Sequence, residues 1–126
     1  MDCRILVVDD DDDVCFTIKY VLERAAYCVL VAGSADQALR AFVEFKPELV
    51  ITDLIMPGES GIDIIRKLKK VAPQVKVVAI SGGERVTDRT ILEDALRVGA
   101  SRALQKPFRH AELMQIVVNL LNSSRV

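Results

Sequence analysis

Short runs of apolar residues, many of them β-branched, alternate along this chain with segments of helical period. No other feature of the sequence restricts the fold as strongly. The runs cover residues 5–8, 28–31, 49–51 and 75–80, and a weaker one covers residues 102–105. Continuous apolar runs of this length are typical of strands buried on both faces, as in parallel sheets. The alternation therefore predicts a parallel β-sheet whose strands are joined by helices.

The segments between and after these runs place apolar residues at helical spacing. In the first segment, Val14, Ile18, Val21, Leu22 and Ala25 fall on one face. Ser34 and Gln37 predict a capping box at the start of the second helix. The other inward positions that we expect are Ala38, Leu39, Phe42 and Val43 in the second helix, and Ile62, Ile65 and Leu68 in a third over residues 61–71. They continue with Ile91, Leu92, Ala95 and Leu96 in a fourth, and Leu113, Ile116, Val117, Leu120 and Leu121 in the last.

The ends of the last two helices are also readable. Thr87 and Asp88 open the fourth helix, and Gly99 suits the position just after its end. The last helix is expected from about residue 109 to 121, with residues 122–126 as a frayed end or the start of a linker. Five strands alternating with five helices predict βαβ units with right-handed crossovers, and therefore a (βα)5 doubly wound α/β domain over residues 1–126.

Composition sets the broad class of protein. A chain of 126 residues is long enough for one domain with a core, and its net charge of −1 excludes a polybasic nucleic-acid binder. No apolar run approaches the roughly 20 residues of a membrane span. The first residues carry no cleavage-site pattern, so we expect no signal peptide. Three cysteines, an odd number with no CxxC pair, favour a reduced, cytoplasmic protein.

Polar residues that can do chemistry follow four of the predicted strands. They are the acidic run Asp9 to Asp13, then Asp53, then Ser81, and finally Lys106 before Pro107. In doubly wound sheets, ligands bind beyond the carboxyl ends of the strands, so these groups should gather at one edge. Neighbouring carboxylates repel each other, and a hard divalent cation such as Mg²⁺ relieves that repulsion. A carboxylate beside such a cation can attack phosphorus and form an aspartyl phosphate, whose oxygens Lys106 and Ser81 could hold.

Four short blocks of this sequence resemble those of a known family. The residues Ile5-Leu-Val-Val-Asp-Asp10, Thr52-Asp-Leu-Ile-Met-Pro57, Ile80-Ser-Gly82 and Lys106-Pro-Phe108 look like the receiver domain of two-component response regulators. The blocks occur in the right order, and the resemblance covers essentially the whole chain. It implies the flavodoxin-like receiver fold with strand order 2-1-3-4-5 and a cis Lys106–Pro107 bond.

The resemblance also implies the function and its residues. Asp53 would accept a phosphoryl group from a sensor histidine kinase or a histidine phosphotransfer protein. Asp10, Asp53 and the backbone carbonyl of Ile55 would bind Mg²⁺, with Asp9 acting through water, while Ser81 and Lys106 would contact the phosphoryl group. The face made by the fourth helix, fifth strand and fifth helix would then carry the signal to a downstream target or fused output domain, with a phosphorylation-dependent dimer as one possibility. Such a domain is a signalling module rather than an enzyme.

One position departs from the family pattern. Many receivers have an aromatic residue or histidine three residues before the lysine, whereas this chain has Ala103, so no ring can swing inward there. Two other functions compete with the first. One is a non-phosphorylated interaction module on the same fold, which the intact acidic, hydroxyl and lysine positions disfavour. The other is a Mg²⁺-dependent hydrolase, but Asp53 lacks the Asp-x-Asp pattern of haloacid-dehalogenase phosphatases.

The remaining notable side chains favour structural interpretations. The sole histidine, His110, is expected at the surface of the last helix. The cysteines (Cys3, Cys15 and Cys28) are expected in or near the core, and the phenylalanines (Phe16, Phe42, Phe45 and Phe108) are expected to pack rather than to form a stacking platform. Asp11, Asp12 and Asp13 are expected to form a solvated patch that favours a helix N-terminus.

Overall fold

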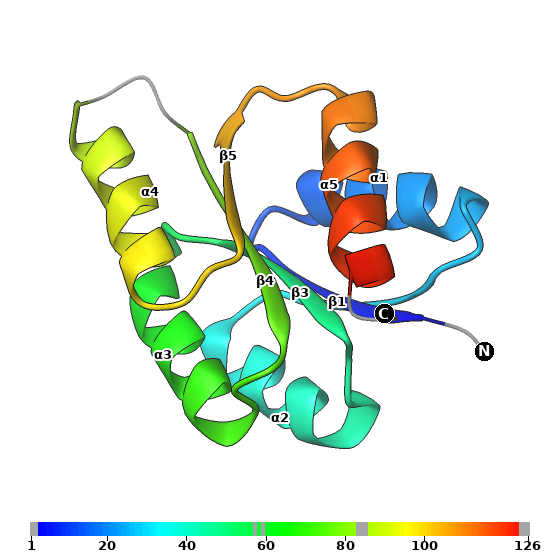
Figure 1. Ribbon diagram of the computed structural model, residues 1–126, viewed down its shortest axis with the longest axis horizontal. Helices are drawn as coiled ribbons and strands as arrows, with labels where there is room; N and C mark the ends of the chain where they lie inside the picture. Colours follow the sequence, from blue (N-terminus) through cyan, green and yellow to red (C-terminus); the bar gives the residue numbers. More distant parts are fainter. Residues whose placement is uncertain (1–2, 57, 59, 83–85, 124–126) are drawn as a thin grey trace.

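The computed structural model describes residues 3–56, 58, 60–82 and 86–123 (Figure 1). Strands and helices alternate strictly along this part of the chain. The strands are β1 (Arg4–Val8), β2 (Cys28–Ala32), β3 (Leu49–Asp53), β4 (Lys76–Gly82) and β5 (Arg102–Lys106). The helices are α1 (Asp12–Arg24), α2 (Ala35–Phe45), α3 (Gly61–Val71), α4 (Val86–Arg97) and α5 (His110–Ser123). The predicted alternation of five strands with five helices is thus confirmed.

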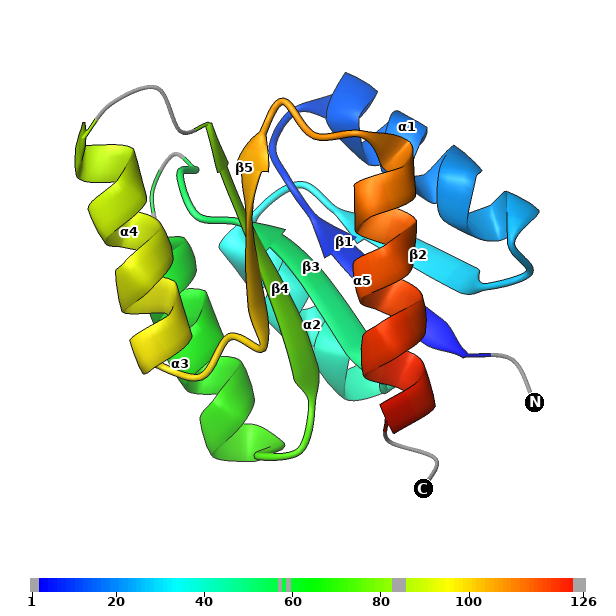
Figure 2. The same ribbon diagram turned by 45° about the horizontal axis from the view of Figure 1, so that its top comes forward.

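The five strands form one parallel sheet in the order β2-β1-β3-β4-β5, as the resemblance implied. Helices α1 and α5 cover one face, while α2, α3 and α4 cover the other (Figure 2). Successive side chains of a strand point to opposite faces, so each central strand feeds both cores. In β3, for example, Val50 packs on the side of α2, α3 and α4, and Ile51 packs on the side of α1 and α5.

Capping residues account for the beginnings of the first three helices. Asp11 caps α1, since its side chain accepts hydrogen bonds from the N–H groups of Asp13 and Val14. Ser34 caps α2 by accepting from Gln37 N–H, and Ser60 caps α3 by accepting from Ile62 N–H. The reciprocal bond differs from that of a capping box, because the Gln37 side chain accepts from the N–H of Gly33 rather than from that of Ser34.

Two helix ends differ slightly from the prediction. Helix α4 begins at Val86 instead of Thr87, and α5 runs through Ser123, beyond the expected end at Leu121. Residues 124–126, the rest of the expected frayed end, lie outside those described. Gly99 has a φ of 120° just after α4, and its N–H donates to the carbonyl of Leu96, as expected for a residue that terminates a helix.

Several side chains that were predicted to be inward are exposed. Val43 in α2 and Leu96 in α4 are 65% and 46% exposed, and Ala25 lies beyond the last turn of α1 in an exposed position. Phe16 was predicted to pack but is 71% exposed on the outer face of α1, and Cys28 is exposed at the start of β2. Each helix contacts the sheet along a stripe narrower than its apolar face, so the flanking apolar residues stay in solvent.

The margins of the sheet are more exposed than its centre. Strands β3 and β4 are buried almost throughout, whereas β2 and β5 each leave several side chains exposed. The expectation that β2 is buried on both faces is therefore wrong, because β2 has a neighbour on one side only. None of the helices in the described part of the chain is long and apolar enough to cross a membrane.

Candidate functional site

Four strand ends bring the predicted site residues together at the carboxyl edge of the sheet. Asp9 follows β1, and Asp53 is the last residue of β3. Ser81 is the second-to-last residue of β4, and Lys106 is the last residue of β5. Strands β1 and β3 are neighbours at which the chain reverses its direction of winding, so Asp9 and Asp53 flank the switch point. This is where a doubly wound sheet binds its ligand.

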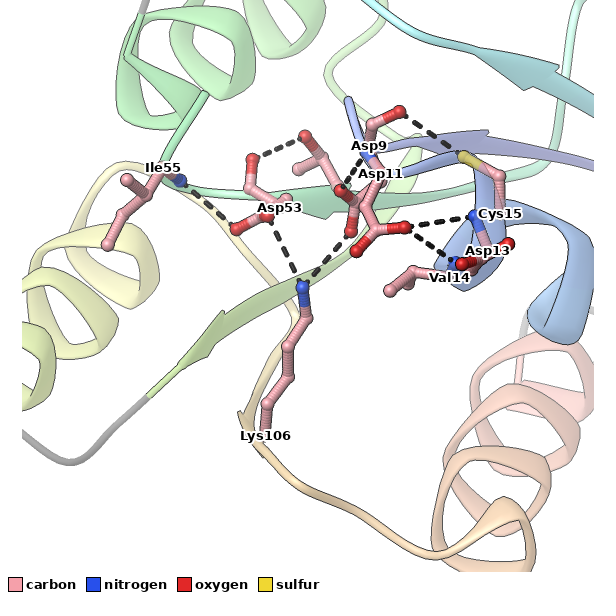
Figure 3. Close-up of polar contacts among 9 residues, drawn as sticks. Asp9, Asp11, Asp13, Val14, Cys15, Asp53, Ile55 and Lys106 are labelled. Atoms are coloured by element: carbon pink, nitrogen blue, oxygen red, sulfur yellow. Dashed lines mark hydrogen bonds and ion pairs between the residues drawn. The ribbon is translucent and has the colours of Figure 1, made fainter. Parts of the chain in front are cut away.

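Lys106 forms ion pairs with two of the carboxylates. Its Nζ atom lies 3.1 Å from Oδ2 of Asp9 and 3.3 Å from Oδ2 of Asp53 (Figure 3). Burial by itself lowers the pKa of Lys106, but the charges of Asp53 and Asp9 outweigh it, and the net shift of the pKa is upward. The ammonium group is therefore charged at neutral pH and balances part of the negative charge of the site.

Asp9 is the most buried acidic residue of the site, with 2% of its surface exposed. Burial raises the pKa of its carboxyl group, and the charge of Asp53 adds to that rise. The N–H of Asp11, 2.9 Å from Oδ1 of Asp9, and the Lys106 ammonium oppose the shift without cancelling it. Asp9 thus carries its charge at a cost that a bound cation would relieve.

Asp10 completes a group of three carboxylates. One oxygen from each of Asp9, Asp10 and Asp53 lies within 4.8 Å of the other two, so a single cation can reach all three residues. Asp10 is exposed while the other two are buried, which leaves one side of the group open to solvent. Hard oxygen ligands of this kind suit Mg²⁺ with part of its water shell retained.

The chain after Asp53 orients its carboxylate. The N–H of Ile55 donates to Oδ1 of Asp53 at 3.1 Å, so one oxygen is held by the backbone while the other faces Lys106 (Figure 3). The Ile55 side chain is about half exposed. The predicted role of the Ile55 carbonyl as a metal ligand stays a prediction.

Ser81 is fully buried, yet its hydroxyl oxygen finds no hydrogen-bond partner among the described residues. A buried hydroxyl without a partner costs free energy, about 1–3 kcal/mol. Such a cost is typical of a group that acquires its partner from a ligand. The hydroxyl lies on β4, the strand next to Asp53, as a contact to a bound phosphoryl group requires.

Gly61 is a site-supporting residue that the sequence analysis did not single out. A Cβ atom at this position would lie 2.5 Å from the Cα of Leu54 and 2.6 Å from the carbonyl oxygen of Asp53. The Gly61 N–H also donates to the Leu54 carbonyl at 3.0 Å. Glycine therefore allows the start of α3 to lie directly against the chain that leaves Asp53. The sequence signal was a glycine directly after the capping residue Ser60.

Two further residues donate hydrogen bonds to the backbone carbonyls of the acidic residues. The Cys15 thiol donates to the Asp9 carbonyl at 3.3 Å, and the Thr52 hydroxyl donates to the Asp53 carbonyl at 3.0 Å. Burial, followed by the charge of Asp9, raises the pKa of Cys15 to about 11. The thiol therefore stays protonated and acts as a packing group and donor, not as a nucleophile.

The remaining sequence predictions near the site have mixed outcomes. The Lys106–Pro107 bond is cis, as expected, and His110 is exposed at the start of α5. Ala103 lies in β5 opposite Ala79 of β4, which packs on the α4 side of the sheet. Gly83, which follows the Ile80-Ser-Gly82 block, lies outside the described residues.

Fold and site together define a doubly wound α/β protein with an acidic group, a hydroxyl and a lysine at its switch point. The family model for the response regulator receiver domain matches residues 5–118. The chain therefore belongs to the response regulator receiver domain family, a family of signalling domains.

Relatives and solved structures agree with this assignment. The chain is 35% identical over 118 residues to the transcriptional regulatory protein PrrA of Mycobacterium tuberculosis, and 34% identical over 120 residues to the DNA-binding transcriptional regulator NtrC of Azospirillum brasilense. These matches cover 94% and 95% of this chain but 49% and 24% of the two relatives, so the chain spans half or less of their length.

Among solved structures, a response regulator receiver domain from Clostridium thermocellum superposes with a TM-score of 0.90 at 34% identity, covering 98% of this chain and 97% of that one. The receiver domain of NtrX from Brucella abortus gives a TM-score of 0.88 at 31% identity, covering 94% of this chain and 98% of that one.

The contact at Gly61 generates a first prediction. Gly61→Ala should lower the free energy of unfolding by about 1–3 kcal/mol, because the new Cβ overlaps backbone atoms that cannot move independently. Urea unfolding followed by circular dichroism measures this. Gly33→Ala is the matched control, since its nearest contacts, at 3.6 Å and 4.0 Å, leave room for a methyl group. Equal stability of the Gly61→Ala variant and the wild type would contradict the close approach.

The ion pairs of Lys106 generate a second prediction. Lys106→Met should lower the free energy of unfolding of the metal-free protein at neutral pH by about 1–3 kcal/mol, because it leaves Asp9 and Asp53 without their cation. The deficit should shrink as the pH falls through the raised pKa of Asp9, because a protonated carboxyl group needs no counter-charge. Urea unfolding across a pH series tests this, and a deficit that stays constant down to pH 3.8, the ordinary pKa of aspartate, would contradict it.

Proposed function

We propose that this domain accepts a phosphoryl group on Asp53 from a phosphorylated histidine of a sensor histidine kinase or a histidine phosphotransfer protein, in a Mg²⁺-dependent reaction in the cytoplasm. The phosphorylated state then signals through the face formed by α4, β5 and α5 to a downstream protein or a fused output domain. The observation that carries the proposal is the arrangement around Asp53. Its carboxylate lies beside the Lys106 ammonium, next to the strand that holds the unpartnered Ser81 hydroxyl.

The reaction requires little of the protein beyond positioning and charge. A carboxylate oxygen of Asp53 forms a bond to phosphorus while the bond from phosphorus to the donor's imidazole nitrogen breaks, and the imidazole leaves with its electron pair. Lys106 is placed to pair with a phosphoryl oxygen, and the Ser81 hydroxyl can donate to another. The buried surroundings of Asp53 strengthen both interactions.

The residues present fit a Mg²⁺ ion. Asp10 and Asp53 are the proposed direct ligands together with the Ile55 carbonyl, and Asp9 acts through a bound water molecule. A bound Mg²⁺ ion would supply positive charge that offsets repulsion between the carboxylates and the incoming phosphoryl oxygens. The support for this assignment is the convergence of three carboxylate oxygens within 4.8 Å and the raised pKa of Asp9.

The signal must be transmitted without an aromatic switch residue. A phosphoryl group biases two conformations only through contacts that differ between them, and Ser81 and Lys106 can supply those contacts. Ser81 leads through Gly82 toward α4, and Lys106 leads through Pro107 toward α5. Because Ala103 leaves no ring to reorient, we propose that backbone movement in the segment from Ser81 to Asp88 carries the change. Residues 83–85 of that segment lie outside those described.

A groove beside the site suits the phosphodonor protein. It has a volume of about 580 Å³ and extends from Lys106 along α1 to the start of α5. Its lining is mainly apolar, with Val14, Ile18, Val21, Pro107, Phe108 and Leu113, and also includes Gly82 and the polar residues Asp13, Thr17, Lys106 and His110. A donor protein that brings its histidine to Asp53 must bind the surface next to Asp53. We therefore propose that a helix of the donor protein packs in this groove.

The phosphoacceptor assignment predicts the behaviour of Asp53→Asn. The variant should form no phosphoryl adduct with acetyl phosphate and Mg²⁺, because the amide is a poor nucleophile. Its fold should remain intact or become slightly more stable, because one charge leaves a like-charged group. Intact-mass spectrometry measures the adduct, and urea unfolding measures the stability. A full adduct on the variant would assign phosphorylation to another residue.

The metal assignment predicts how Mg²⁺ binding depends on Asp10 and on pH. Asp10→Ala should weaken Mg²⁺ binding on the order of 10–100-fold, whereas Asp12→Ala, in the same acidic run but in the first turn of α1, should not. Affinity should begin to fall at a higher pH than an ordinary aspartate would give, since the pKa of Asp9 is raised above 3.8 and protonated carboxyls bind cations poorly. Isothermal titration calorimetry measures both, and unchanged binding by Asp10→Ala would refute the assignment.

The groove along α1 predicts that a variant can slow transfer from a donor protein without slowing transfer from a small phosphodonor. Thr17→Glu places a charge in the apolar groove from an exposed position, so transfer from the phosphorylated donor protein should slow about tenfold or more. Labelling by acetyl phosphate should be unchanged, because a small donor needs no groove. Val43→Glu on the exposed face of α2 is the control and should affect neither reaction. Equal slowing of both donors by Thr17→Glu would show damage to the site instead.

A further inference from the structure

Strand β2 forms one margin of the sheet and pairs with β1 alone (Figure 2). The Cys28 N–H donates to Cys3 at 2.9 Å, and the Ala32 carbonyl accepts from Asp9 at 3.1 Å, so the backbone groups of these residues face β1. Backbone groups of successive residues point to opposite sides of a strand. Those of Val29 and Val31 therefore face away from the sheet, and no described residue pairs with them.

This edge carries neither a charged side chain nor a proline, two common protections against pairing. Exposed edge strands normally carry charges or proline, which prevent another strand from adding to them. The opposite margin, β5, carries the exposed charge of Arg102 and the exposed polar side chain of Gln105. Strand β2 reads Cys-Val-Leu-Val-Ala, and its Leu30 and Val31 are each 39% exposed. An apolar, unpaired edge is therefore retained on one margin alone.

The free backbone groups are arranged symmetrically. Val29 and Val31 lie on either side of Leu30, so a two-fold axis through Leu30 would pair each chain with itself in antiparallel register. Val29 would then form a hydrogen-bonded pair with the partner's Val31, and Val31 with the partner's Val29. Leu30 would face the partner's Leu30 across the axis, where antiparallel strands bring side chains closest.

Charges beside the edge follow the same symmetry. A groove of about 710 Å³ runs between β2 and α2, and Leu30, Arg40 and Glu44 are among its lining residues. Arg40 and Glu44 lie one helical turn apart on α2. A two-fold axis through Leu30 would make the two α2 helices antiparallel, and Arg40 and Glu44 of one copy would then lie opposite Glu44 and Arg40 of the other. An unrelated extended peptide would satisfy the backbone groups but would have no reason to match both charges.

We propose that the free edge of β2 is a self-association surface, through which two copies of this chain join their sheets in antiparallel register about Leu30. This surface lies on the opposite margin of the sheet from β5. Association through β2 is therefore independent of the phosphorylation-dependent face and does not rest on the proposed function. It leaves Asp53 and the groove beside α1 on a separate part of each copy.

Analytical ultracentrifugation over a concentration series up to about 1 mM, which populates complexes with millimolar dissociation constants, tests the proposal. The mass should rise from 13.9 kDa toward twice that value, with or without beryllofluoride. Leu30→Lys should abolish the rise, because two like charges would meet at the axis. Val43→Lys, which adds the same charge at a more exposed position of α2 outside the groove, should leave the rise unchanged.

A charge exchange tests the register itself. Arg40→Glu should weaken association about tenfold or more, and the double variant Arg40→Glu/Glu44→Arg should restore it, since the exchanged pair is again self-complementary. In hydrogen exchange followed by nuclear magnetic resonance, the Val29 and Val31 amides should exchange fast at low concentration and slowly at high concentration. A wild-type chain that stays monomeric throughout would overturn the proposal and leave the edge to an extended segment of another protein. A dimer that Leu30→Lys does not disturb would overturn it too, because another face would then form the contact.

Discussion

The contact of one ammonium group with two carboxylates is the interaction on which the rest of this structure depends. Lys106 reaches Asp9 and Asp53 from β5, across the position that β4 occupies between β3 and β5. Without this ammonium group, the two buried carboxylates would repel each other at close range with no positive charge between them. The parallel sheet makes the contact possible, since it brings the carboxyl ends of strands distant in sequence to one edge. Fold and electrostatics are therefore linked at a single point.

The surroundings of that point are organised for a ligand rather than for stability alone. The Ser81 hydroxyl is buried without a partner, and burial raises the pKa of Asp9. Both features cost free energy in the isolated protein and would be relieved by a phosphoryl group and a cation. Gly61 keeps the chain after Asp53 close to α3, so the carboxylate is held in place while its partners change. Local cost and precise positioning occur together, as is common at functional sites.

The two margins of the sheet differ in a way that suits two separate tasks. Strand β5 carries Lys106 at its end and polar residues along its exposed edge, which connects the site to α4 and α5. Strand β2 has no residue of the site and presents an apolar edge with unpaired backbone groups. Ala103, where many receivers have a ring, is the reason why the proposed signal runs through the backbone after Ser81. The proposed change at the site and the proposed association at β2 would therefore not interfere with each other.

Much of this protein could be predicted from sequence, because periodicity and strand-end chemistry are local properties. The period of 3.6 residues located α3 at Gly61–Val71, and the apolar runs located all five strands to within two residues at each end. Asp9, Asp53 and Lys106 were identifiable as one group because parallel strands end at a common edge. The strand order and the cis bond before Pro107 came from family resemblance, since neither follows from local pattern.

Tertiary structure decided what depends on distances between segments far apart in the chain. Val43 and Leu96 continue apolar stripes, but they are exposed because the sheet covers only part of each helix. The need for glycine at position 61 follows from its contact with Leu54, and the high pKa of Cys15 follows from its burial beside Asp9. The free edge of β2 exists only because the strand order places it at the margin. Sequence specifies which groups a segment offers, whereas packing determines which of them meet a partner and which remain in solvent.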